Sequence, residues 1–213
     1  MLTCLRESDI RDSRVMDAMA AVPRDEFVPP DVRHLAYGPN PLAIGHGQTI
    51  SSPFIVASMT ELLELQGGEK VLEIGTGCGY QTAILCEITK EVWSIEIVPE
   101  VAAMGAANLT RLGYSPKLKL GDGSDGWAEQ APFDRVFLTA TSPRIPPGLL
   151  DQLTVGGIAL GPEREDQQRG HGDGGREVLV RYVRTGQGFE RSIIYAVRFV
   201  PMTGKAGSRA PGE

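Results

Sequence analysis

The sequence lacks several features that mark specialised classes of protein. It contains only three cysteines, Cys4, Cys78 and Cys86, an odd number without a C-x-x-C pair. Neither a disulfide framework nor a zinc site is indicated, and no bound metal is expected. No apolar run is long enough to span a bilayer, and the first residues, MLTCLRESDIRDSR, lack the apolar core of a secretory signal. These absences predict a cytoplasmic protein with no membrane partner.

Positive charge is also scarce in this chain. Lys and Arg number 21 against 27 Asp and Glu, which gives a net charge of -6. Non-specific binding to nucleic acid requires a basic face, so no nucleic-acid partner is expected. A length of 213 residues suits one domain that buries a full core, and we expect it to be a monomer.

From residue 70 onward, short apolar strands alternate with helices. The expected strands, the last two of which form a hairpin, lie at residues 71–74, 91–97, 117–120, 135–140, 156–160, 177–183 and 189–200. Alternation with short connections predicts a doubly wound α/β fold, in which helices cover both faces of a mostly parallel sheet. The hairpin adds two antiparallel strands at the edge, which makes seven strands in all.

The remaining segments complete one expected domain over residues 1–204. Residues 1–30 predict an N-terminal helix, and the glycine- and proline-rich residues 36–50 predict an irregular functional loop. The three parts of the domain are the N-terminal helix with the substrate loop, the cofactor-binding core and the C-terminal hairpin, over residues 1–52, 53–161 and 177–200. The polar stretch 163–176 is expected to be a mobile loop, and residues 205–213 a disordered tail.

A glycine-rich loop is the strongest local signal. Glu73-Ile74-Gly75-Thr76-Gly77-Cys78-Gly79 follows the first strand of the sheet and opens a helix. Glycines at such a turn allow a ligand to approach the main chain closely. Glu96 ends the next strand, where a carboxylate can accept hydrogen bonds from the hydroxyls of a ribose. Gly121 and Asp122 follow the third strand and would lie at the same edge of the sheet.

Two cofactors suit this arrangement, a nicotinamide dinucleotide and S-adenosylmethionine. The glycines are spaced G-x-G-x-G, whereas the dinucleotide fingerprint is G-x-G-x-x-G. Glu73, two positions before the first glycine, would repel a pyrophosphate but suits the positive sulfonium and amino group of S-adenosylmethionine. We therefore expect S-adenosylmethionine. A dehydrogenase is also disfavoured because no suitable catalytic set is evident.

Several motifs together resemble the protein-L-isoaspartate O-methyltransferase family. The shared segments extend over nearly the whole chain and include VPRDEFVP (22–29), PLAIGHGQTISSP (41–53), VLEIGTGCGYQTA (71–83) and FVPMTG (199–204). The resemblance implies a Rossmann-like methyltransferase fold. It also implies methyl transfer from S-adenosylmethionine to the free carboxylate of L-isoaspartyl residues in damaged peptides and proteins, which begins their repair through a succinimide.

The resemblance also implies roles for individual residues. Ser51 would be the active-site residue and would orient the acceptor carboxylate, although its position alone favours a helix-capping role beside Ser52. The residues implied to hold the cofactor or line the site are Gln48, Thr49, Ile50, Ser51, Glu73, Gly75, Thr76, Gly77, Cys78, Gly79, Glu96, Ile97, Gly121, Asp122 and Thr203. A carboxylate needs no strong base at neutral pH, so His46 is interpreted as a loop residue. Cys78 is interpreted as a small residue that fits its turn, although a helix N-terminus can lower the pKa of a thiol.

Three positions depart from the pattern of that family on the side expected to face the peptide. Pro39 stands where an acidic residue is common, Thr141 where alanine is common, and Glu163-Arg164 where valine-glycine is common. These departures leave open a related function, methylation of an ordinary aspartate in a precursor peptide to form an aspartimide. A cofactor-binding module without activity is the alternative from another class, and the intact GQTIS block (47–51) and glycine loop disfavour it.

Overall fold

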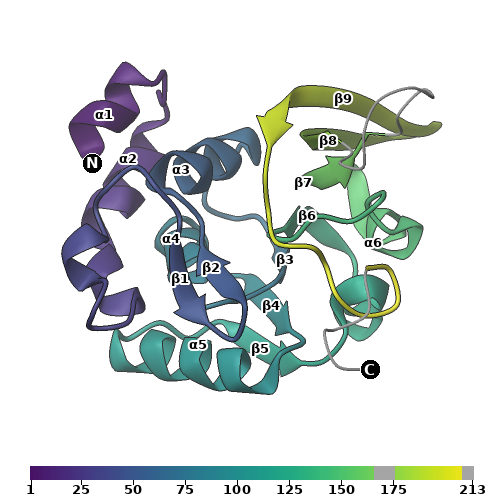
Figure 1. Ribbon diagram of the computed structural model, residues 1–213. Helices are drawn as coiled ribbons and strands as arrows, with labels where there is room; N and C mark the ends of the chain where they lie inside the picture. Colours follow the sequence, from purple (N-terminus) through teal and green to yellow (C-terminus); the bar gives the residue numbers. More distant parts are fainter. Residues whose placement is uncertain (166–175, 208–213) are drawn as a thin grey trace.

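A sheet of seven strands forms the centre of the computed structural model, which describes residues 1–165 and 176–207 (Figure 1). In chain order the strands are β3 Val71–Ile74, β4 Val92–Glu96, β5 Lys117–Leu120, β6 Phe133–Leu138, β7 Leu153–Arg164, β8 Glu177–Thr185 and β9 Gly188–Val197. Their spatial order is β5-β4-β3-β6-β7-β8-β9. Strands β3 to β7 pair in parallel, whereas β8 and β9 pair antiparallel. The predicted seven-stranded sheet with its C-terminal hairpin is confirmed.

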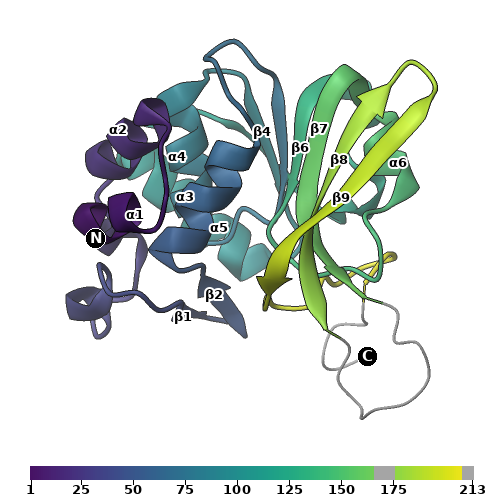
Figure 2. The same ribbon diagram turned by 90° about the horizontal axis from the view of Figure 1, so that it is seen from above.

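Helices cover both faces of this sheet (Figure 2). One face carries α3 (Pro53–Leu62), α4 (Tyr80–Ile88) and α5 (Pro99–Arg111), and the opposite face carries α6 (Pro147–Asp151). The short 3-10 helices are η1 Arg24–Phe27, η2 Arg33–Leu35, η3 Gly123–Asp125 and η4 Ala128–Gln130. Within the described ranges, no helix has the length and apolarity needed to cross a membrane.

Strand β3 contributes side chains to two separate cores. Val71 packs with Met59 of α3 on one face of the sheet, and Leu72 packs with Leu149 of α6 on the other. This follows from the alternation of side chains along a strand. All four residues of β3 are buried, as expected for a central parallel strand covered on both faces. The carboxyl end of β3 is therefore a rigid point on which a site can be built.

The N-terminal segment is helical, as predicted, but it contains two helices in place of the single helix expected there. Helices α1 (Leu2–Glu7) and α2 (Ser13–Ala21) are separated near Asp9, whose φ of 66° is not helical. Asp12 caps α2, and its own N–H donates to the carboxylate of Glu61 on α3 at 2.7 Å. A side chain of another helix thus satisfies a backbone donor at the break. Apolar periodicity alone contains no sign of that contact.

The loop expected over residues 36–50 contains two short strands. Strand β1 (Leu42–Gly45) pairs antiparallel with β2 (Gln48–Ile50). His46 lies in the turn between them, exposed and with a φ of 52°. Its interpretation as a loop residue is confirmed. The glycines of this turn have positive φ values, and glycines of this kind are typical of irregular loops. The sequence therefore predicted an irregular loop where the structure has two paired strands.

The first two residues of the loop expected at residues 163–176 belong to strand β7. Arg164 at the end of β7 pairs with Glu177 at the start of β8. The central part, 166–175, lies outside the described residues. The ladder between β7 and β8 is therefore longer than the apolar runs in the sequence suggest.

The tail expected to be disordered over 205–213 starts as an ordered segment. The N–H of Lys205 donates to the Asp122 carboxylate at 2.8 Å, and the N–H of Ala206 donates to the Ser124 hydroxyl at 3.1 Å. Residues 208–213 lie outside the described residues. The chain is thus held against the loop after β5 through residue 206.

Glu163, a departure from the family pattern, is a fully buried carboxylate in β7. It accepts hydrogen bonds from the Ile145 N–H at 2.9 Å and the Tyr182 hydroxyl at 2.8 Å, and it pairs with Arg191 at 2.7 Å and with Arg144 at 3.0 Å. Burial alone would raise the pKa of this carboxyl, but the hydrogen bonds outweigh burial and hold the pKa below its usual range. Glu163 therefore fixes the loop after β6 to the C-terminal hairpin.

Candidate active site

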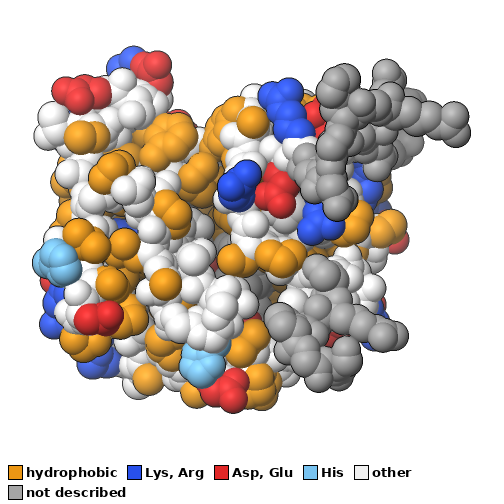
Figure 3. Space-filling model, in the orientation of Figure 1, with side chains coloured by type: hydrophobic (Ala, Val, Ile, Leu, Met, Phe, Trp, Pro, Cys, Tyr) orange, Lys and Arg blue, Asp and Glu red, His pale blue; other side chains and the backbone are white. Residues whose placement is uncertain are grey.

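A cavity of about 730 Å³ opens at the carboxyl ends of β3, β4 and β6. Five segments that are distant in sequence line it: residues 48–52, 74–78, 95–98, 139–140 and 196–203. Figure 3 shows this face hollowed between the N-terminal part and the hairpin, with hydrophobic side chains on both sides. The volume and the mainly apolar surroundings are typical of a small-molecule site.

Most of the residues that the sequence implicates in the site line this cavity. They are Gln48, Thr49, Ile50, Ser51, Gly75, Thr76, Gly77, Cys78, Glu96, Ile97 and Thr203. Four others, Glu73, Gly79, Gly121 and Asp122, lie outside the lining. A ligand in the cavity can therefore contact the first group directly, whereas the four residues of the second group are not part of the cavity wall.

The glycine loop forms the floor of the cavity because main chain replaces side chains there. Gly75 has a φ of 100°, and a Cβ on it would lie 2.2 Å from Oγ1 of Thr139. That hydroxyl donates to the Gly75 carbonyl at 2.9 Å. A Cβ on Gly105 of α5 would lie 2.5 Å from the carbonyl oxygen of Gly77. Any side chain at Gly75 or Gly105 would push apart elements that must meet beneath the ligand.

Glu96 presents a fixed carboxylate at the end of β4. Its Oε2 accepts from the N–H of Gly77 at 2.9 Å, and its Oε1 accepts from the N–H groups of Ile97 at 2.9 Å and Val98 at 3.0 Å. A carboxylate offers about four acceptor positions, so Glu96 retains capacity for a ligand hydroxyl. These residues suit the adenosine part of S-adenosylmethionine, because the acceptor needs no reorganisation on binding.

Glu73 lies behind the loop, and its expected direct contact with the cofactor is not what the structure shows. The alternation of β3 directs its side chain toward α4, where it accepts from Thr82 at 2.5 Å and Ser94 at 2.6 Å. Ser94 also bonds the hydroxyl of Thr76, which lines the cavity. Burial raises the pKa of Glu73 to about 8. Glu73 thus supports the loop through Ser94 and is protonated near neutral pH.

Two other predicted site residues, Cys78 and Asp122, have structural roles. Cys78 is buried, and burial raises the pKa of its thiol to about 11, so it is not an activated thiol. This agrees with its interpretation as a small residue that fits the turn. Asp122 caps η3 through the N–H of Ser124 and holds Lys205, so its carboxylate fixes the chain end.

The sequence left two roles open for Ser51, capping of a helix and contact with a ligand, and in the structure Ser52 takes the first of them. The hydroxyl of Ser52 accepts from the N–H of Ile55 at 3.4 Å and caps α3. Ser51 lines the cavity, and its carbonyl accepts from Nη2 of Arg24 at 2.6 Å. Within the part of the chain that the structure describes, no hydrogen bond engages the Ser51 hydroxyl. That hydroxyl is thus available to a ligand in the cavity.

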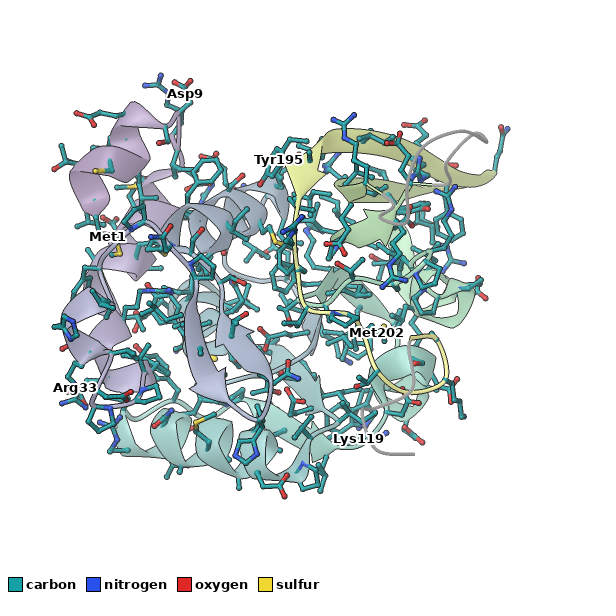
Figure 4. The ribbon with its side chains drawn as sticks, in the orientation of Figure 1. Met1, Asp9, Arg33, Lys119, Tyr195 and Met202 are labelled. Atoms are coloured by element: carbon teal, nitrogen blue, oxygen red, sulfur yellow. The ribbon has the colours of Figure 1, made fainter. Side chains whose placement is uncertain are left out.

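Sequence reasoning missed the cavity wall formed by residues 196–202. In Figure 4 this segment leads from the end of the hairpin at Tyr195 down to Met202. It is held by main-chain bonds to Thr141, whose N–H donates to the Val200 carbonyl at 2.9 Å and whose carbonyl accepts from Met202 at 2.7 Å. The FVPMTG motif was visible in the sequence and was a signal for this wall.

Comparison with known proteins decides the family. The model of the protein-L-isoaspartate(D-aspartate) O-methyltransferase (PCMT) family matches residues 1–207. The chain belongs to the PCMT family. It is 50% identical over 198 residues to a protein-L-isoaspartate O-methyltransferase of Anaeromyxobacter dehalogenans, with 91% of each chain covered. A relative of the same description from Myxococcus xanthus is 47% identical over 208 residues, covering 94% of this chain and 93% of the relative.

A solved structure agrees with this family at the level of the fold. A Plasmodium falciparum protein described as a PCMT, in complex with S-adenosyl-L-homocysteine, matches with a TM-score of 0.79 at 22% identity. The match covers 95% of this chain and 96% of that one. This PCMT is therefore a methyltransferase of Rossmann-like fold that uses S-adenosylmethionine, as predicted. The nicotinamide alternative and the non-catalytic alternative are set aside.

We expect Glu96→Ala to weaken the binding of S-adenosyl-L-homocysteine by about 1–3 kcal/mol, because it removes a charged hydrogen-bond acceptor at the cavity. Titration calorimetry measures this change. Glu100→Ala, which removes an exposed carboxylate from the first turn of α5, is the matched control. An affinity unchanged by Glu96→Ala would mean that the ribose is bound elsewhere.

The raised pKa of Glu73 predicts a pH-dependent stability. Because its folded pKa of about 8 exceeds that of an unfolded carboxyl, about 4.3, its contribution is complete below the unfolded value and is lost as the pH rises through about 8. Urea unfolding at about pH 6 and about pH 9 should show a smaller loss of stability in Glu73→Gln than in the unchanged protein. Equal losses in both proteins would rule out this carboxyl as the source.

Proposed function

We propose that this PCMT methylates the free carboxylate of L-isoaspartyl residues in damaged peptides and proteins, with Ser51 orienting that carboxylate. The observation that carries the proposal is the place of Ser51. Ser51 lines the same cavity as the glycine loop and Glu96, and among the described residues no hydrogen bond engages its hydroxyl. The family description names L-isoaspartate and D-aspartate as acceptors, and the relatives from Anaeromyxobacter and Myxococcus have the same description.

The chemistry requires alignment more than proton transfer. S-Adenosylmethionine supplies a methyl group that is activated by the positive charge on its sulfur. Glu96 and the main chain of residues 75–78 would hold it. A carboxylate is already deprotonated at neutral pH, so the chain has only to orient it and remove water from it. Ser51 would donate a hydrogen bond to one carboxylate oxygen and leave the other oxygen to attack the methyl group.

Apolar side chains support the removal of water at the acceptor end. Ile50, Ile55 and Val56 line the cavity beside Ser51. Water excluded by these side chains cannot stabilise the acceptor carboxylate, which makes its oxygen more reactive. The Ser51 hydroxyl then supplies one directed interaction in an otherwise apolar wall.

The three departures from the family pattern favour the repair substrate over a dedicated precursor peptide. Pro39, Thr141 and Glu163 all lie outside the cavity lining. Thr141 pairs its main chain with the C-terminal wall, and the Glu163 carboxylate holds a loop to the hairpin. Thr141 and Glu163 thus act behind the wall, and all three substitutions leave the cavity lining to other residues.

We further infer that residues 1–204 act as one domain and as a monomer in the cytoplasm. The cavity draws residues from position 41 to position 203 of a single chain, which supports one functional unit. Cys4, Cys78 and Cys86 are all free, which suits a reducing compartment.

The proposed function predicts selective methyl transfer. With labelled S-adenosylmethionine and two peptides that differ only in L-isoaspartate or aspartate at one position, we expect label in the isoaspartyl peptide alone. Preferential labelling of the aspartyl peptide would instead favour the precursor-peptide alternative. Transfer to neither peptide would contradict the proposed acceptor.

Ser51→Ala should reduce kcat/KM for the isoaspartyl peptide by roughly 10- to 100-fold, because a hydrogen bond to a charged acceptor is lost. The affinity for S-adenosyl-L-homocysteine should change by less than about threefold. Ser58→Ala removes a hydroxyl of α3 that bonds Tyr195 outside the cavity lining and serves as the control. Equal losses in cofactor affinity and kcat/KM would contradict the role of Ser51.

A further inference from the structure

Arg24 is a buried cation that contacts both ends of the substrate loop. It begins η1 and is 0% exposed. Its Nε donates to the carbonyl of Ala36 at 2.7 Å, and its Nη2 donates to the carbonyl of Ser51 at 2.6 Å. The guanidinium also lies over the ring of Tyr80, 4.8 Å from the ring centroid. Tyr80 and Ser51 both line the cavity, whereas Arg24 does not.

The charge of Arg24 has no carboxylate partner among the residues that the structure describes, and its Nη1 has no hydrogen-bond partner there. Burial lowers the pKa of Arg24 from its usual value, yet an arginine side chain stays protonated in proteins. A buried charge without an ionic partner is costly, and a Leu or Met would fill the same space without that cost. The presence of an arginine here therefore calls for a role that packing does not supply.

The geometry of the guanidinium indicates what that role is. Its donors form a rigid planar fork, so two carbonyls bound to it are held at a fixed separation. Ala36 and Ser51 bound the segment that contains β1 and β2, and both give their carbonyls to this fork. Ser52 is held by its cap on α3. The main chain of Ser51 is thus fixed on both sides, which sets the direction in which its side chain leaves the backbone.

We propose that Arg24 is a positioning residue for the methyl acceptor, which acts through the main chain of Ser51. The inference rests on the proposed function, because the acceptor carboxylate is what Ser51 would orient. It assigns a role to the VPRDEFVP motif, whose arginine lies behind the cavity wall. Loss of Arg24 should then impair the acceptor half of the site and spare the half formed by Glu96 and the glycine loop.

The test compares Arg24→Met and Arg24→Lys with Arg135→Met. Arg135 is a matched control because its guanidinium also donates to backbone carbonyls, those of Asp134 at 2.9 Å and Glu64 at 3.2 Å, and it lies outside the cavity lining. Three quantities are measured: the affinity for S-adenosyl-L-homocysteine, kcat/KM for the isoaspartyl peptide, and amide hydrogen exchange over residues 36–51.

We expect Arg24→Met to lower kcat/KM for the peptide by roughly 10- to 100-fold and to speed exchange over residues 36–51, because two charged hydrogen bonds are lost. Cofactor-product affinity should stay within about threefold of the unchanged protein. Arg24→Lys keeps a cation that reaches one carbonyl at a time, so its kcat/KM should be intermediate. Arg135→Met should leave both kcat/KM and the exchange of this segment near their original values.

Several results would overturn the proposal. These are an unchanged kcat/KM in Arg24→Met, a loss of cofactor-product affinity as large as the loss in kcat/KM, or an equal loss in Arg135→Met. If Arg24→Met does not fold, Arg24→Lys decides, and a kcat/KM equal to that of the unchanged protein rejects the role. If the unchanged protein does not methylate the isoaspartyl peptide, the proposed function fails. Amide hydrogen exchange over residues 36–51 still tests separately whether Arg24 holds this segment in place. Exchange that is unchanged in Arg24→Met rejects that role.

Discussion

The structure depends on the close approach of β3 and β6 at their carboxyl ends. The chain winds from β3 toward β4 and β5 on one side and later returns to β6 and β7 on the other, so the loops that follow β3 and β6 diverge above the sheet. A crevice opens at such a point in parallel sheets, and ligands bind there. The Thr139 hydroxyl bonds the Gly75 carbonyl beneath the crevice, which keeps its floor narrow. The other walls of the cavity are added to this floor.

The two halves of the cavity rest on different kinds of interaction. The part formed by the glycine loop and Glu96 consists of main chain at the ends of central strands, where Glu96 accepts three backbone N–H groups. The rest of the wall consists of segments outside those strands, and buried charged side chains hold them in place: Arg24 for the loop that carries Ser51, and Glu163 for the loop beside the hairpin.

The features that could be predicted from sequence are those with a local signature. Apolar runs located the seven strands, and the spacing of Gly75, Gly77 and Glu96 located one wall of the cavity. What could not be predicted depends on contacts between distant residues. The break in the N-terminal helix involves Glu61, some fifty residues away, and the C-terminal wall is held by Thr141 about sixty residues before it. The placement of Glu73 behind its loop follows from the alternation of side chains along β3, whereas its charge alone suggested contact with the cofactor.

The position of residues 196–203 in the cavity wall has a consequence for the synthesis of the protein. The glycine loop and the end of β4 leave the ribosome long before this wall, because they lie between residues 74 and 98. A nascent chain that ends before the Val200 main chain can pair with Thr141 lacks one wall of this cavity. The complete wall of the cavity therefore forms only after this region has been translated.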